Sequence, residues 1–177
     1  MKTDSTANPA AIAAPFARIL VAIDRSAPSA WALQLASRLA AATGATLLLV
    51  HVADTRIATP SEVAYVQSGI LDELVHDGED LLDRVRQQVP TALAIETHLC
   101  HGVPSTEISE QAKRWSVDLI VMGAHSHSRL AEFLLGSTAE KVVRDAPCPV
   151  MTVRHPPVES AATASRAAAV TMGPERR

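Results

Sequence analysis

Two short segments of the chain carry residue types that could hold an anion. The first is the run MGAHSHS over residues 122–128, and the second is Gly136-Ser137-Thr138. Glycine can adopt a positive φ and lets the backbone approach a ligand closely, which we expect of Gly123. Free backbone N–H groups at a helix N-terminus attract phosphate, which we expect of residues 136–138. The two segments together place two glycines and a pair of hydroxyls around one loop, which predicts a phosphate-binding site.

Some of the candidate residues also have a plainer structural explanation. Asp24 follows a buried apolar run and could simply cap the turn after it. Ser137 and Glu140 have the spacing of a capping box, which would use the serine hydroxyl to start a helix. His51 stands at the end of another apolar run and is expected to be packed or hydrogen-bonded.

These residues need a scaffold, and the hydrophobic pattern predicts one. Continuous apolar runs, typical of strands buried on both faces, occur at residues 18–23 and 117–122, and further strands are predicted at residues 46–52, 92–99 and 148–153. Helical patterns fall between them, from Pro28 to Gly44, over about residues 61–88, from Pro104 onward, and from Ser137 to Pro147. The order predicts an α/β fold with an open, five-stranded parallel sheet, helices on both faces and strand order 3-2-1-4-5.

In such a sheet, ligands bind beyond the carboxyl ends of the strands. Three segments fall at this edge: residues 22–26 after the first strand, His51-Val52 at the end of the second, and the long loop after the fourth. We therefore expect Asp24, Val52 and the glycine-containing loop to meet at one site.

Composition and charge exclude several classes of protein. The 16 basic and 19 acidic residues give a net charge of −3, which argues against a nucleic-acid partner. The five aromatic residues are too few for a base-stacking platform. No apolar stretch approaches the roughly 18 residues that a membrane-spanning helix needs, so no membrane partner is expected. Two cysteines fit a reducing compartment, and we expect the protein in the cytoplasm.

The two ends of the chain differ in composition from the part between them. Residues 1–15 and 155–177 are rich in alanine, proline and small polar residues, and both are predicted to be disordered tails. Residues 16–154 are then expected to form one domain.

Histidines and cysteines give only weak signals for chemistry. The pairs His98/His101 and His125/His127 lack the cysteine or carboxylate partners of a zinc site, so no metal is expected. Cys148 lies between two prolines and is expected to be buried, whereas Cys100 is expected to be partly exposed. No nucleophile elbow is present, and no catalytic residue is predicted.

The sequence resembles the universal stress protein family. The resemblance covers roughly residues 17–154 and is carried by ILVAIDRS (19–26), VHV (50–52), VMGAHS (121–126), LLGSTAE (134–140) and APCPV (146–150). ATP-binding members carry Gly-x2-Gly-x9-Gly-Ser/Thr, and Gly123, position 126, Gly136 and Ser137 keep this spacing. The family's second glycine is Ser126 here, which could donate its hydroxyl to a phosphate or crowd the site.

The resemblance implies a Rossmann-like fold of the adenine nucleotide alpha hydrolase type with a site for ATP. ADP and AMP are the alternative ligands, and Mg²⁺ could accompany the nucleotide. Asp24 would lie near the ribose and adenine, and the backbone of Val52 would bond the adenine edge. Gly123, His125 and Ser126 would line the phosphates, and Gly136, Ser137 and Thr138 would hold their far end. The remaining residues of the implied cofactor site are Ala22 and Met122.

Three functions remain open from the sequence. The first is an ATP-binding module in stress response that acts by nucleotide occupancy. The second is an interaction dimer without nucleotide, in which Ser126 has closed the phosphate site. The third is a slow ATPase or an adenylate-transferring enzyme. The family resemblance also implies a homodimer through the fifth strand, whose exposed edge invites self-pairing.

Overall fold

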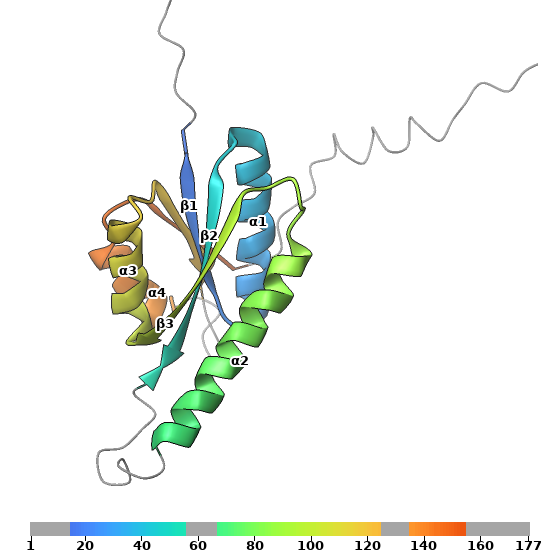
Figure 1. The fold of residues 1–177 in the computed structure, drawn as a ribbon. Helices are drawn as coiled ribbons and strands as arrows, with labels where there is room; N and C mark the ends of the chain where they lie inside the picture. The colour runs from blue at the N-terminus through green and yellow to red at the C-terminus, as the bar shows by residue number, and fades with distance from the viewer. Residues whose placement is uncertain (1–14, 56–66, 125–134, 155–177) are drawn as a thin grey trace, which may run out of the picture.

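Five parallel strands form one sheet in the order β3-β2-β1-β4-β5 in the computed structural model (Figure 1). The structure describes residues 15–55, 67–124 and 135–154. The elements are β1 (Arg18–Ile23), α1 (Ala27–Thr43), β2 (Thr46–Asp54), α2 (Gln67–Gln88), β3 (Ile95–Gly102), α3 (Pro104–Arg114), β4 (Leu119–Gly123), α4 (Ser137–Asp145) and β5 (Val150–Val153). The predicted fold class and strand order are confirmed.

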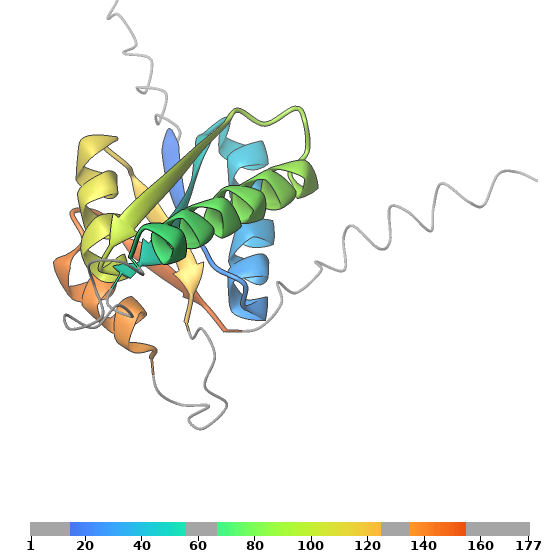
Figure 2. The ribbon, with the colours of Figure 1, turned by 60° about the horizontal axis from the view of Figure 1, so that its bottom comes forward.

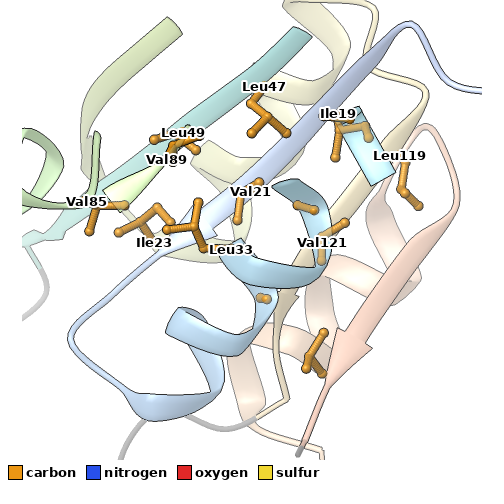
Figure 3. Close-up of a cluster of buried hydrophobic side chains, with 14 of the residues drawn as sticks. Ile19, Val21, Ile23, Leu33, Leu47, Leu49, Val85, Val89, Leu119 and Val121 are labelled. Atoms are coloured by element: carbon orange, nitrogen blue, oxygen red, sulfur yellow. The ribbon is translucent and has the colours of Figure 1, made fainter. Parts of the chain in front are cut away.

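Helices cover both faces of the sheet, with α1 and α2 on one side and α3 and α4 on the other (Figures 1 and 2). Strand residues point alternately to the two faces. Val21 therefore packs toward α1 and α2, and its neighbour Leu20 toward α3 and α4. Figure 3 shows Val21 in the first cluster, with Leu33 of α1 and Val85 of α2. This double burial explains why β1 and β4 are almost entirely apolar.

Local signals set the ends of α1 where the sequence predicted them. Ser26 is the N-cap and accepts a hydrogen bond from the Ser29 amide, and a proline lies in the first turn. Gly44 ends the helix in the left-handed region at φ 75°. In the structure, the buried side of α1 is made of small residues such as Ala32, Ala36 and Ala40, so the helix packs closely on the sheet.

Several predicted strand boundaries were wrong by two or three residues. The third strand begins at Ile95 because a turn precedes it, in which the Leu93 amide donates to the Pro90 carbonyl at 3.0 Å. It continues to Gly102, and β2 likewise continues to Asp54. The fourth strand begins at Leu119 rather than residue 117 and ends at Gly123, and the fifth begins at Val150 rather than residue 148.

Parts of the predicted organisation lie outside the described residues: both predicted tails apart from Pro15, and the first residues, 61–66, expected in the second helix. Within the described ranges, no helix is both long and apolar enough to cross a membrane.

Candidate functional site

A cavity of about 490 Å³ opens at the carboxyl edge of the sheet. The ends of β1, β2 and β4 and the start of α4 line it, with α2 and α3 at its sides. Its lining includes these residues of the predicted site: Ala22, Asp24, Val52, Met122, Gly123, Gly136, Ser137 and Thr138. The other two predicted site residues, His125 and Ser126, lie outside the described residues. The structure therefore brings every described member of the predicted set to one cavity.

Asp24 is half-buried and oriented by the loop between β1 and α1. The amide of Ser26 donates to Asp24 Oδ1 at 2.8 Å, and the Ser26 hydroxyl donates to the same oxygen. The plainer explanation of Asp24 as a turn cap is therefore correct for Oδ1. Both bonds from this loop go to Oδ1, and Asp24 is one of the residues that line the cavity.

Gly123 lines the cavity but lacks the positive φ that was predicted for it. The described glycines with a positive φ are Gly44 and Gly102, so Gly123 is not a left-handed turn residue. A Cβ at Gly123 would lie 3.0 Å from the backbone carbon of Pro28 and 3.0 Å from the Ser29 nitrogen. The glycine is needed because the first turn of α1 packs directly on the end of β4.

The predicted capping box at the start of α4 is not formed. The N-cap is Gly136, at φ −62° and ψ 148°, and no side chain caps the helix. Ser137 is the first helical residue, one position too late for its hydroxyl to cap the first turn. The Gly136 amide donates to the Ala124 carbonyl at 2.8 Å, which ties the start of α4 to the end of β4.

The start of α4 consequently has the chemistry of an anion site. The first N–H groups of a helix have no partner within the helix, and the dipole places partial positive charge at this end. Ser137 is exposed, and Ser137, Thr138 and Ala139 all line the cavity. A negatively charged group here would meet unsatisfied amides and two hydroxyls.

An ion pair that the sequence analysis missed crosses the rim of the cavity. Arg25 Nη2 lies 3.2 Å from Asp77 Oδ2 and donates to the Asp77 carbonyl at 3.3 Å, which links the β1–α1 loop to α2. Both side chains are more than half exposed, at 51% and 61%, so the pair contributes at most about 1 kcal/mol. The partners are 52 residues apart, and no local pattern could have paired them.

His51 is hydrogen-bonded, as the sequence predicted. Its Nδ1 lies 2.8 Å from the Ile23 carbonyl, across the β1–β2 pair. A Cβ at Gly78 of α2 would lie 2.9 Å from His51 Cδ2 and 2.6 Å from Leu99 Cδ1. Gly78 therefore allows α2 to approach the sheet closely beside the cavity.

The other histidines and the cysteines give no reactive centre among the described residues. His98 and His101 are three apart in β3, so they point to opposite faces of the sheet. No group of three or more potential metal ligands occurs in the described ranges. The predicted exposures of the cysteines were reversed, since Cys100 is buried and Cys148 half-buried. Burial raises the pKa of both thiols, which makes each a poor nucleophile at neutral pH.

Known proteins resemble this chain over most of its length. The universal stress protein family matches residues 15–154. The universal stress protein YxiE of Bacillus subtilis is 35% identical over 147 residues, which cover 78% of this chain and 99% of that protein. The solved universal stress protein UspA from Lactobacillus plantarum has a TM-score of 0.70 and 30% identity, over 77% of this chain and 97% of that one. A universal stress protein solved in complex with cAMP has a TM-score of 0.54 and 24% identity, over 79% of this chain and 98% of that one.

Proposed function

Since the chain belongs to the universal stress protein family, we propose that it binds ATP in the cavity at the carboxyl edge of its sheet. It acts in stress response through nucleotide occupancy, without a need for turnover. The observation that carries this proposal is the meeting of Asp24 and the uncapped start of α4 at one cavity of about 490 Å³. That volume lies within the range of small-ligand sites, about 300–1,000 Å³.

The adenine and ribose occupy the part of the cavity between β1 and β2. Strand β1 ends at Ile23, opposite His51, whereas β2 continues through Val52 to Asp54. Beyond His51, the backbone of β2 therefore has no neighbouring strand on the β1 side, and it can bond the edge of a planar base. The Asp24 carboxylate accepts a hydrogen bond from a ribose hydroxyl, a charge-assisted contact.

The phosphates lie at the start of α4. Gly136, Ser137 and Thr138 supply amides and hydroxyls there, and the helix dipole adds a favourable field. The described lining also includes Asp24, Asp54 and Asp77, with Arg25 the basic residue among them. Mg²⁺ bound to the triphosphate would offset part of the repulsion between these carboxylates and the ligand.

The comparisons support an adenine nucleotide on this fold. The universal stress protein solved in complex with cAMP shares this fold and holds such a ligand. The choice of ATP over ADP or AMP rests on the spacing of Gly123, Gly136 and Ser137.

The first test is to denature the purified protein and separate the released small molecules by nucleotide chromatography. Titration calorimetry of nucleotide-free protein with Mg-ATP, ADP, AMP and cAMP then ranks the ligands. We expect ATP to bind, and a flat titration with all four would refute the proposal. Phosphate release that disappears in Asp24→Ala would show instead that the protein is a slow ATPase.

A second candidate function follows from Ser126, which stands where the family pattern has glycine. In this alternative the serine closes the phosphate site, and the protein acts as an interaction dimer without nucleotide. The variant Ser126→Gly separates the two functions. ATP binding that appears only in Ser126→Gly would favour the alternative, and equal binding by both proteins would favour the ATP site.

We also propose a homodimer through β5. This strand is at the edge of the sheet, its residues 150–152 are half-buried, and Val143 on the neighbouring α4 is 50% exposed. An edge strand offers unpaired backbone groups to a second copy. Light scattering after size-exclusion chromatography should give twice the mass of the chain. We expect Thr152→Pro to shift the protein toward monomer.

We place the protein in the cytoplasm as part of the same proposal. Both cysteines are free, which is typical of a reducing compartment. Fractionation of cells that express the protein, with immunoblotting of each fraction, tests this location.

A further inference from the structure

The loop between β1 and α1 contains a buried serine that the proposed ligand contacts do not use. Ser29 is 2% exposed and lies in the first turn of α1. Its hydroxyl accepts a hydrogen bond from the Asp24 amide at 3.0 Å and donates to the Ala22 carbonyl at 3.3 Å. One side chain thus holds the backbone on both sides of Ile23, directly before the carboxylate proposed to bind ribose.

The hydrogen bonds of this loop form a continuous network. The Ser29 amide donates to Ser26 Oγ at 3.2 Å, and the Ser26 hydroxyl donates to Asp24 Oδ1. A hydroxyl has one hydrogen to donate and two lone pairs to accept. Each serine here uses its hydrogen once and accepts one amide, so all these bonds form at the same time. The network therefore fixes both the backbone and the carboxylate of Asp24.

Strand β4 restricts the same serine from the other side. A Cβ at Gly123 would lie 3.0 Å from the Ser29 nitrogen, so the two backbones are nearly in contact. Gly123 also lines the cavity. Ser29 therefore connects the carboxylate side of the cavity with the end of β4.

We propose that Ser29 is a positioning residue, whose buried hydroxyl holds the backbone of Asp24 and so keeps its carboxylate at the cavity. The functional part of this inference rests on the proposed nucleotide binding. Serine is a poorer helix former than alanine, and helix formation alone would favour alanine at this position. The two hydrogen bonds that its hydroxyl makes to the loop explain why a serine stands at this position.

The variant Ser29→Ala removes both hydroxyl bonds and leaves the Ser26 cap in place. Ser109→Ala is the matched control, because Ser109 is 4% exposed, lies in α3, has no hydrogen-bond partner for its hydroxyl, and does not line the cavity. The first readout is hydrogen exchange of the Asp24 amide by NMR. We expect slow exchange in the wild type and Ser109→Ala, and exchange at least about tenfold faster in Ser29→Ala.

The second readout compares ATP with 2′,3′-dideoxy-ATP, which lacks the ribose hydroxyls. The wild type should prefer ATP by about tenfold or more, as expected for a hydrogen bond to a charged group. Ser29→Ala should lose most of this preference and change dideoxy-ATP affinity little. A purely structural role of Ser29 would instead weaken both ligands equally, which would overturn the inference.

The double variant Ser29→Ala/Asp24→Asn tests whether the serine acts through Asp24. We expect it to bind ATP no more weakly than Asp24→Asn alone, whereas additive losses would contradict the inference. Wild-type protein that binds neither nucleotide would refute the proposed function. Positioning of Asp24 would then be decided by exchange of its amide, and unchanged exchange in Ser29→Ala would refute it.

Discussion

Helices α1 and α4 each follow residues that line the cavity, and their first turns are built differently. Helix α1 has a side-chain cap, because Ser26 accepts a hydrogen bond from the Ser29 amide at 3.2 Å. Helix α4 begins at Gly136 and has no side-chain cap. Asp24 and Arg25, just before α1, line the same cavity as Ser137 and Thr138 at the start of α4.

This difference suggests two uses of a helix N-terminus. At α1, the protein's own oxygens satisfy the polar groups, and the result is a fixed Asp24 carboxylate. At α4, no side chain among the described residues caps the first amides, which are the donors that we propose for the phosphates. A capped start thus suits a residue that must be held, and an uncapped start suits a ligand that must be received.

The variant Asp24→Asn should have the largest effect on binding and tests the α1 side. Asparagine can keep its carbonyl oxygen toward Ser26 while an NH₂ group replaces the other carboxylate oxygen. We expect ATP affinity to fall by about 10- to 100-fold, the range for a hydrogen bond to a charged group. Calorimetry measures the affinity, and urea denaturation should give an unfolding free energy close to that of the wild type. Unchanged ATP affinity would remove Asp24 from the site.

Gly123→Ala tests the packing that supports the α1 start. The added Cβ would lie 3.0 Å from backbone atoms of Pro28 and Ser29, which cannot rotate away. We expect the unfolding free energy to fall by about 1–3 kcal/mol, as for other overpacked sites. Urea denaturation measures this loss, with Ser109→Ala as the control. A fully stable Gly123→Ala protein would contradict the close packing.

Ser137→Pro tests the donors of α4 without breaking the helix. Proline is well tolerated at the first helical position, and Gly136 at ψ 148° has the extended backbone that a following proline requires. The change removes one amide donor and one hydroxyl. We expect ATP affinity to fall by about tenfold and adenosine affinity to stay constant, since adenosine has no phosphate.

The control for this prediction is Ser137→Ala, which keeps the amide and removes only the hydroxyl. A smaller loss in Ser137→Ala would assign the main role to the backbone. If Ser137→Pro bound ATP as tightly as the wild type, the uncapped start of α4 would not be a phosphate site.

Ser26→Ala should give the smallest change and compares the two helix starts directly. Loss of an N-cap side chain costs about 1 kcal/mol, so thermal unfolding should shift to a slightly lower temperature. Gly136→Ala at α4 should change stability less, because no side-chain bond is lost there. If Ser26→Ala and Gly136→Ala lowered stability equally, the Ser26 side-chain cap would not stabilise the start of α1.

The sequence was most informative where the signal was local. The alternation of strand-like and helical patterns predicted all five strands, and short motifs pointed to Asp24, Gly136, Ser137 and Thr138, which line one cavity. The capping box failed because Ser137 entered the helix one position later than a cap requires, a shift that motif spacing cannot resolve. The packing role of Gly123 was missed because its neighbour, the first turn of α1, lies about a hundred residues earlier in the chain.

The Arg25–Asp77 ion pair at the rim of the cavity should be more sensitive to salt than the hydrogen bonds around Asp24 and Ser29. Both partners are largely in water, so dissolved ions screen their attraction, and at about 1 M salt the Debye length shrinks to about 3 Å. The bonds around Asp24 and Ser29 join half-buried and buried groups over short distances, and salt affects them little. Rising ionic strength should therefore loosen α2 from the β1–α1 loop before it disturbs the hydrogen bonds of the Asp24 carboxylate.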